Sequence, residues 1–141
     1  MEQKGSMSNI VLFDHERITV DYMPDKKIIR HTIHAPVRGQ VFRDALNTGT
    51  AALAKYGACK WLSDDRKDGP QSEEEQQWGF DDWNRRTIEA GWKYWALVVP
   101  QVVADAGTLT PTIEDLYTRG LRVMVFTKPE DALAWLDSFP N

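Results

Sequence analysis

Three histidines, His15, His31 and His34, carry the side chain best suited to catalysis or metal binding near neutral pH. His31 and His34 are three residues apart in a stretch that we expect to be a strand. Side chains alternate between the two faces of a strand, so these two should point to opposite sides and not share a metal ion. No HExxH, HxxEH or Cys/His spacing accompanies any histidine. We therefore interpret all three as structural and predict no metal site.

Asp64 and Asp65 are neighbouring carboxylates that follow an apolar stretch ending at Leu62. Open α/β sheets bind ligands beyond the carboxyl ends of their strands, so this pair could hold a cation or serve, with a nearby histidine, as acid and base in an enzyme. Arg66 and Lys67 follow at once, and a solvated turn with local ion pairs explains the run more simply. The sequence has no GxGxxG, P-loop or GxSxG pattern. We predict no catalytic residues, no cofactor and no enzymatic activity.

Tryptophan is unusually frequent, with six in 141 residues. Three of them fall in expected strands or on an expected core face, where packing is their role: Trp61, Trp83 and Trp95. Trp78 falls almost opposite that core face, and an exposed tryptophan is typical of a binding patch. Packing of Trp78 against the loop 66–71 is the alternative, and Trp92, in a turn before a strand, could join the patch.

Composition limits the classes of function. The chain has 42% hydrophobic residues and a net charge of −4, which indicates a globular protein without a basic surface for nucleic acid or anionic membranes. Cys59 is the only cysteine, so a reducing, cytoplasmic location is favoured. No apolar run approaches 18 residues, which predicts no membrane insertion. We expect residues 1–8 to be a disordered leader or a remnant of cloning, and residues 9–141 to form one domain.

The elements that must position these side chains begin with strands at 10–13, 17–22 and 27–34, the last two joined by turn residues 23–26. Helical periodicity from 37 to 56 ends at Gly57, and Gly49 on its apolar face predicts a close approach to the sheet. A short strand at 59–62 and a polar loop at 63–71 follow.

Ser72 and Glu75 have the S-x-x-E spacing of a capping box, in which each side chain bonds the other residue's amide. A helix from there to about residue 90 would bury Phe80, Trp83, Thr87 and Ala90. Strands at 94–99 and 121–126 alternate with helices that start at Thr110 and, by a second capping box, at Thr127. The fold class is therefore α/β: a mixed sheet of N-terminal antiparallel strands and then parallel β/α units, flanked by about four helices.

Three stretches resemble the small bacterial STAS-domain proteins of the SpoIIAA-like fold: 60–66, 78–100 and 129–136. The resemblance covers residues 9–138. It implies kinship with phosphorylatable anti-anti-sigma regulators, cytoplasmic parts of anion transporters and a structurally related lipid-exchange class. In the regulators a phosphorylatable serine lies in an Asp-Ser-Ser-Gly-like turn, whereas residues 63–72 here lack that motif. Ser72 is followed by three glutamates that would repel a phosphate, so capping is its expected role.

The resemblance implies a non-catalytic regulatory or protein-interaction module, with a protein partner or self-association. Its expected contact surface comprises Ser63, Asp64, Asp65, Arg66, Ser72, Trp78 and Trp92. The lipid-exchange relatives imply an alternative, a domain that binds a small apolar ligand or a lipid, which requires a cavity of roughly 300 Å³ or more. A third alternative is an enzyme that uses Asp64 and Asp65.

Overall fold

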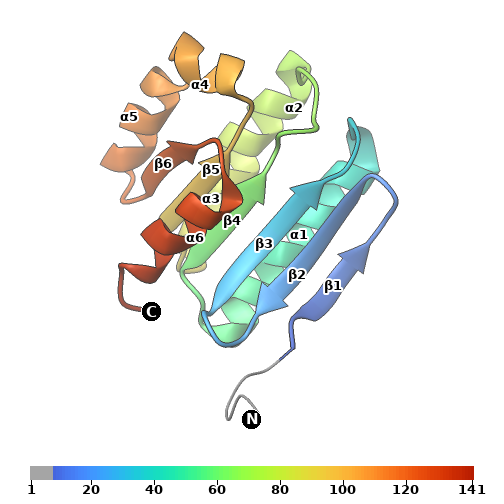
Figure 1. Cartoon of the computed structure of the whole chain (residues 1–141). Helices are drawn as coiled ribbons and strands as arrows, with labels where there is room; N and C mark the ends of the chain where they lie inside the picture. Colours follow the sequence, from blue (N-terminus) through green and yellow to red (C-terminus); the bar gives the residue numbers. More distant parts are fainter. Residues whose placement is uncertain (1–7) are drawn as a thin grey trace.

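The sheet is assembled in the order of the chain. The computed structural model describes residues 8–141, in which six strands lie side by side from β1 to β6 (Figure 1). The strands are β1 (Ile10–Asp14), β2 (Ile18–Met23), β3 (Ile28–Ile33), β4 (Lys60–Asp64), β5 (Tyr94–Val98) and β6 (Arg122–Phe126). The first three pair antiparallel and the last four pair parallel. The predicted mixed sheet is confirmed, and its arrangement is consistent with a SpoIIAA-like α/β fold.

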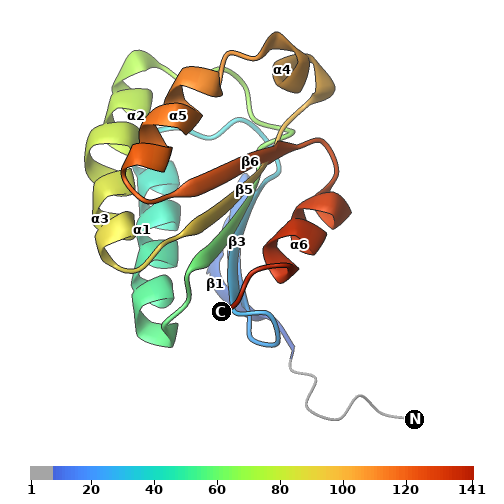
Figure 2. The same ribbon diagram turned by 90° about the vertical axis from the view of Figure 1, so that its left-hand side faces the viewer.

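Helices cover the two faces of the sheet unequally. Figure 2 shows four helical segments on one side: α1 (Gly39–Tyr56), α2 (Glu73–Trp78), α3 (Asn84–Glu89) and α5 (Thr110–Thr118). Only α6 (Pro129–Asp137) covers the other face, where it packs on β4, β5 and β6. A short helix that the sequence did not predict, α4 (Gln101–Ala106), follows β5. Connections between neighbouring parallel strands are almost always right-handed. Because β3 to β6 follow one another across the sheet in chain order, the helices that connect them all lie on the same face.

The segment from Glu73 to Glu89 is one continuous helix with a wider turn in its middle. The π-helical turn η1 (Gly79–Trp83) joins α2 to α3, and the backbone stays in the right-handed helical region at both junctions. Hydrogen bonds in such a turn span five residues instead of four, so the faces before and after it are rotated relative to each other. This rotation overturns the prediction for Trp78, which was extrapolated at the ordinary helical period.

Trp78 is half-buried against α1 and does not form an exposed patch. Its ring meets the Phe42 ring edge-on, with centroids 6.3 Å apart, and the Arg43 guanidinium lies 5.0 Å from its centroid. Trp92 is also interior, at 1% exposure, so the prediction that it joins a surface patch is wrong.

The core under α1 contains a cluster of tryptophans that pack edge-on or tilted against one another. Trp61, Trp83, Trp92 and Trp95 form a chain of ring contacts with centroids 4.9–5.8 Å apart. Gly49 of α1 faces this cluster, and a Cβ added there would overlap the outer ring atoms of Trp61. The predicted close approach of α1 to the sheet at Gly49 is confirmed. Glycine is needed at position 49 because the indole of Trp61 occupies the space that a larger side chain would fill.

Several predicted helix starts need correction. The N-cap residue of α5 is Leu109 and not Thr110, that of α6 is Lys128, and neither residue forms a side-chain capping bond. Thr127 therefore forms no capping box, because the helix begins one residue later than its spacing predicted. Among residues 8–141, no helix combines the length and apolar character needed to cross a membrane. The predicted leader, residues 1–8, lies outside the described residues except for Ser8.

Candidate functional site

A pocket of about 740 Å³ opens at the carboxyl end of the parallel strands. Its walls come from α1, from the helix that contains η1, and from the start of α5. Asp65, directly after β4, and Trp95 of β5 form its floor on the sheet side. This edge is where open α/β sheets generally bind ligands.

Aromatic side chains supply much of the pocket surface. Phe42 of α1, Phe80 and Trp83 of η1, and Trp95 of β5 all line it. Two of these four belong to the π-helical turn, and such turns occur frequently at functional sites because they re-aim side chains. The turn thus presents Phe80 and Trp83 to the same cavity, three residues apart.

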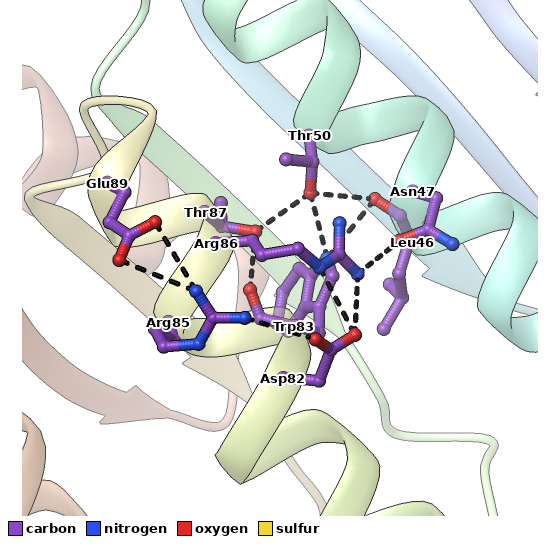
Figure 3. A network of polar contacts seen from close by, with 9 residues as sticks. All are labelled: Leu46, Asn47, Thr50, Asp82, Trp83, Arg85, Arg86, Thr87 and Glu89. Carbon is purple, nitrogen blue, oxygen red and sulfur yellow. Dashed lines mark hydrogen bonds and ion pairs between the residues drawn. The ribbon is translucent and has the colours of Figure 1, made fainter.

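Trp83 is held in place by hydrogen bonds between α1 and α3, drawn in Figure 3. Its indole N–H donates to Thr50 Oγ1 at 2.8 Å and to the Leu46 carbonyl at 3.2 Å. Thr50 Oγ1 lies 2.8 Å from Thr87 Oγ1, and Thr87 donates to the Trp83 carbonyl at 2.8 Å. This network fixes the wall of the pocket before any ligand arrives.

Arg86 extends the same network toward the surface. It donates to Asn47 of α1 at 2.8 Å and to Asp82 at 3.1 Å (Figure 3). The contact with Asn47 ties α3 to α1, whereas the Asp82 contact lies within one helix. The two helices that wall the pocket are therefore joined by polar contacts as well as by aromatic packing.

His31 and Asp65 form a hydrogen-bonded pair on the pocket floor. His31 Nε2 lies 2.7 Å from Asp65 Oδ1, and both residues line the pocket. The other ring nitrogen, Nδ1, accepts the N–H of Trp61 at 3.1 Å. An indole nitrogen can only donate, so Nδ1 carries no proton and the neutral ring has its proton on Nε2, which donates to Asp65. His34 lies away from this pair and contacts Thr19 at 3.1 Å, so the predicted separation of the two histidines is confirmed.

Ser63 lies beneath this pair and is inaccessible. It is completely buried in β4, accepts the N–H of Trp95 at 2.8 Å, and lies 3.5 Å from His31 Nδ1. A serine nucleophile needs a free base nitrogen and access to substrate, and Ser63 has neither. Its prediction as a contact residue is wrong because β4 extends two residues further than predicted, which places Ser63 inside the sheet.

Glu75 is the most unusual charged group of the lining. Ser72 accepts the Glu75 amide at 3.2 Å, which confirms half of the predicted capping box. The Glu75 carboxylate does not return the bond. Its Oε1 accepts from Arg43 Nη2 at 3.2 Å, and Oε2 is buried without a hydrogen-bond partner among the described residues. The side chain is only 6% exposed and lines the pocket.

Asn84 is a second polar group of the lining without a structural partner. It is 5% exposed, and its side-chain amide makes no hydrogen bond to another residue of the described part. Buried polar groups are nearly always hydrogen-bonded, so each exception requires an explanation. Among the described residues the fully buried side-chain atoms without a partner are Glu75 Oε2 and Arg43 Nε, and the amide of Asn84 is not one of them.

Asp64 and Arg66 form an ion pair apart from the pocket. Arg66 donates through Nε at 2.9 Å and Nη2 at 2.8 Å to the two carboxylate oxygens of Asp64. Burial acts to raise the pKa of Asp64, but the hydrogen bonds and charge of Arg66, with a smaller effect of His31, outweigh it and hold the pKa below its ordinary value. The predicted local ion pair is confirmed for these two residues.

Of the seven residues predicted to form a contact surface, only Asp65 lines the pocket. Ser63 and Trp92 are interior, Trp78 packs on α1, and Ser72 caps α2. The sequence interpretation missed His31, Glu75 and Asn84 as site residues. His31 is 34 residues from Asp65, and only the parallel register of β3 and β4, which pairs His31 with Ser63, brings the two together.

Comparison with family models, curated proteins and solved structures gives no match for this chain. The resemblance to STAS domains therefore stays a prediction. What the coordinates define is an α/β domain with a preformed pocket of ligand size at the carboxyl end of its parallel strands.

Proposed function

We propose that this chain is a binding domain for a small organic molecule, which it holds in the pocket between α1, η1 and α5. A volume of about 740 Å³ lies within the range of ligand sites, roughly 300 to 1,000 Å³. Aromatic walls and a few convergent polar groups are the usual composition of such sites. The observation that carries the proposal is the pocket itself, lined by four aromatic side chains and by the buried carboxylate of Glu75.

The proposal concerns binding and assigns no catalytic step. Asp65 is engaged by His31, and the imidazole of His31 is engaged on both nitrogens. The hydroxyl nearest to the pair, that of Ser63, is completely buried. This arrangement supports the prediction of a non-catalytic domain, with the alternative of a small apolar ligand changed to that of a ligand with polar groups.

A regulatory role of the STAS type, in the cytoplasm, completes the proposal. A binding domain of this size regulates a process by contacting a protein partner in a ligand-dependent way. Large apolar side chains that are exposed lie away from the pocket, on β1, α4, α5 and β6: Ile10, Val11, Val102, Tyr117 and Met124. Tyr117 and Met124 line a second, smaller pocket of about 210 Å³, and we propose it, in place of Trp78 and Trp92, as the contact for a protein partner.

A ligand screen tests the proposal directly. We expect some members of a library of ring-containing small molecules to shift the indole N–H resonances of Trp83 and Trp95 in NMR spectra of the labelled protein. Substitution Thr112→Trp places a bulky ring in the pocket lining and should abolish these shifts. Thr118→Trp, at the exposed end of α5, is the matched control. The proposal is wrong if no compound shifts the two resonances, or if Thr112→Trp leaves the shifts unchanged.

A further inference from the structure

The charged side chains that line the pocket are acidic, and two arginines, Arg43 and Arg119, contact lining residues without being part of the lining. Asp65, Glu73 and Glu75 line it, whereas no lysine or arginine among the described residues does. The only titratable group of opposite character is His31, and the indole N–H of Trp61 on its Nδ1 identifies it as the neutral tautomer. Phosphorylated and carboxylate ligands are therefore disfavoured by like-charge repulsion.

Arg43 does not remove this bias. Its Nη2 reaches Glu75 Oε1 from outside the lining, and its guanidinium lies over the ring of Trp78. One arginine thus pairs with Glu75 and leaves Asp65 and Glu73 without a cationic partner in the pocket. The second oxygen of Glu75 remains buried and unbonded. A buried carboxylate oxygen without a donor is energetically costly, and Arg43 Nε, also buried without a partner, is the other unmatched atom of this ion pair.

The aromatic walls select for the same charge. Phe80, Trp83 and Trp95 line the same pocket as Glu75, and the guanidinium of Arg119 lies 4.6 Å from the centroid of the Phe80 ring. The faces of aromatic rings carry partial negative charge and attract organic cations, most strongly when the site is shielded from water. Ring faces and carboxylates thus favour one kind of ligand, a flat or ring-bearing group attached to a protonated nitrogen.

We propose that the pocket binds a ring-bearing organic cation whose N–H group donates to Glu75, with its ring between Phe80, Trp83 and Trp95. This inference rests on the proposed ligand-binding function and specifies the chemical class of the ligand. Asn84, whose amide is also unbonded, supplies a second polar contact from the same helix.

Three probes with one ring and different charge test the inference: phenethylammonium, 2-phenylethanol and 3-phenylpropionate. Titration of each into the unmodified protein, followed by the indole N–H resonances of Trp83 and Trp95, gives the relative affinities. We expect phenethylammonium to bind at least about tenfold more tightly than the alcohol, and the carboxylate to bind most weakly. This comparison needs no variant and so does not depend on how a substitution affects folding.

A pair of variants then locates the charge. Glu75→Gln keeps the shape of the side chain and should weaken phenethylammonium binding by about tenfold, with little change for the alcohol. Glu74→Gln removes the neighbouring carboxylate, which is 87% exposed, lies 3.8 Å from Arg43 and does not line the pocket, and it should leave both affinities unchanged. Circular dichroism of the two variants checks that the fold is retained.

The possible outcomes separate the two proposals. If the alcohol or the carboxylate binds as tightly as the cation, or if none of the three probes binds, the inference is overturned. The general proposal survives that result when other compounds of the library still shift Trp83 and Trp95. If no compound of any charge shifts these resonances, both proposals fail.

Discussion

Asp64 shows how one neighbouring side chain sets the pH range over which a carboxylate stabilises the fold. Its pKa is held below the ordinary value because the hydrogen bonds and charge of Arg66 outweigh burial. A carboxylate whose folded pKa is depressed contributes stability above its unfolded pKa, about 3.9, and loses this contribution as the pH falls through the folded value. Without Arg66, burial alone would raise the pKa, and the sign of the contribution would reverse.

The pH dependence of Arg66→Met follows from this sign. We expect the variant to have a lower free energy of unfolding than the native protein at pH 7, because a buried carboxylate is then unpaired. The difference should shrink as the pH falls below about 4 toward the depressed folded pKa of Asp64, because protonation removes the charge that Arg66 stabilises. Urea denaturation at several pH values between 3 and 7 measures it. Lys67→Met, which removes an exposed charge next to Arg66, should show no such trend.

At this scale the sequence predicted ionic pairs within a turn but not contacts across the fold. Asp64 and Arg66 are two residues apart, so local geometry was enough to anticipate their contact. The pair His31 and Asp65 depends on the register of two parallel strands, which periodicity does not specify. Glu75 had the correct spacing for a capping box, yet Arg43 of another helix competes for its carboxylate. For His31 and for Glu75, contacts between elements far apart in the sequence determine the hydrogen-bond partner.

The elements that form the pocket depend on how closely α1 approaches β4. Gly49 makes this approach possible because Trp61 occupies the position that a larger residue would need. Trp61 in turn contacts Trp83, with ring centroids 5.1 Å apart, and donates to His31. A displacement of α1 would therefore reach two residues of the pocket lining.

Substitution Gly49→Ala should lower the free energy of unfolding by about 1 to 3 kcal/mol, the typical cost of overpacking, although alanine has the better helix propensity. Gly79→Ala is the matched control. Gly79 is also helical, a Cβ there meets nothing within 4 Å, and the change should be neutral or stabilising. Chemical denaturation measures the free energy of unfolding of both variants. Equal changes at the two positions would contradict the steric role of Trp61.

Periodicity predicted the helices well where they are regular and failed at the irregular turn. Helix α1 ends at Gly57 as expected, because glycine readily adopts the left-handed conformation found there. The π-helical turn has no simple sequence signature, so Trp78 was assigned to the wrong face. The short helix α4 was missed because its six residues show no apolar stripe.

In the whole molecule, the pocket lies on one face of the sheet and a separate apolar cluster lies on the other. Pocket residues lie on the side of α1, η1 and α5, while α6 closes the opposite face over Leu62 and Ala96. Lys60 also joins that face to the chain end, because its Nζ donates to the Phe139 carbonyl at 2.6 Å. The sequence predicted this α/β class and the six strands along the chain correctly, but not which helices cover which face of the sheet.

Leu136→Ala should separate stability from ligand binding. Leu136 is a residue of α6 whose side chain is completely buried. Its truncation should lower the free energy of unfolding by about 2 to 5 kcal/mol. Ligand affinity, measured at a temperature where the variant remains folded, should stay unchanged because α6 does not line the pocket. Ala134→Ser, on the exposed side of the same helix, should affect neither quantity strongly. A loss of affinity in Leu136→Ala would show that the two faces are coupled.

The strand order β1 to β6 also has a consequence during translation. Each strand pairs with the one made immediately before it, so the sheet can grow at one edge as the ribosome releases the chain. No early strand has to wait for a late one to be inserted beside it, and loop closure stays local. Only α6 must be completed before Ile28, near the beginning of the chain, is shielded from water. Nascent chains that end before Pro129 should consequently expose that apolar face to chaperones.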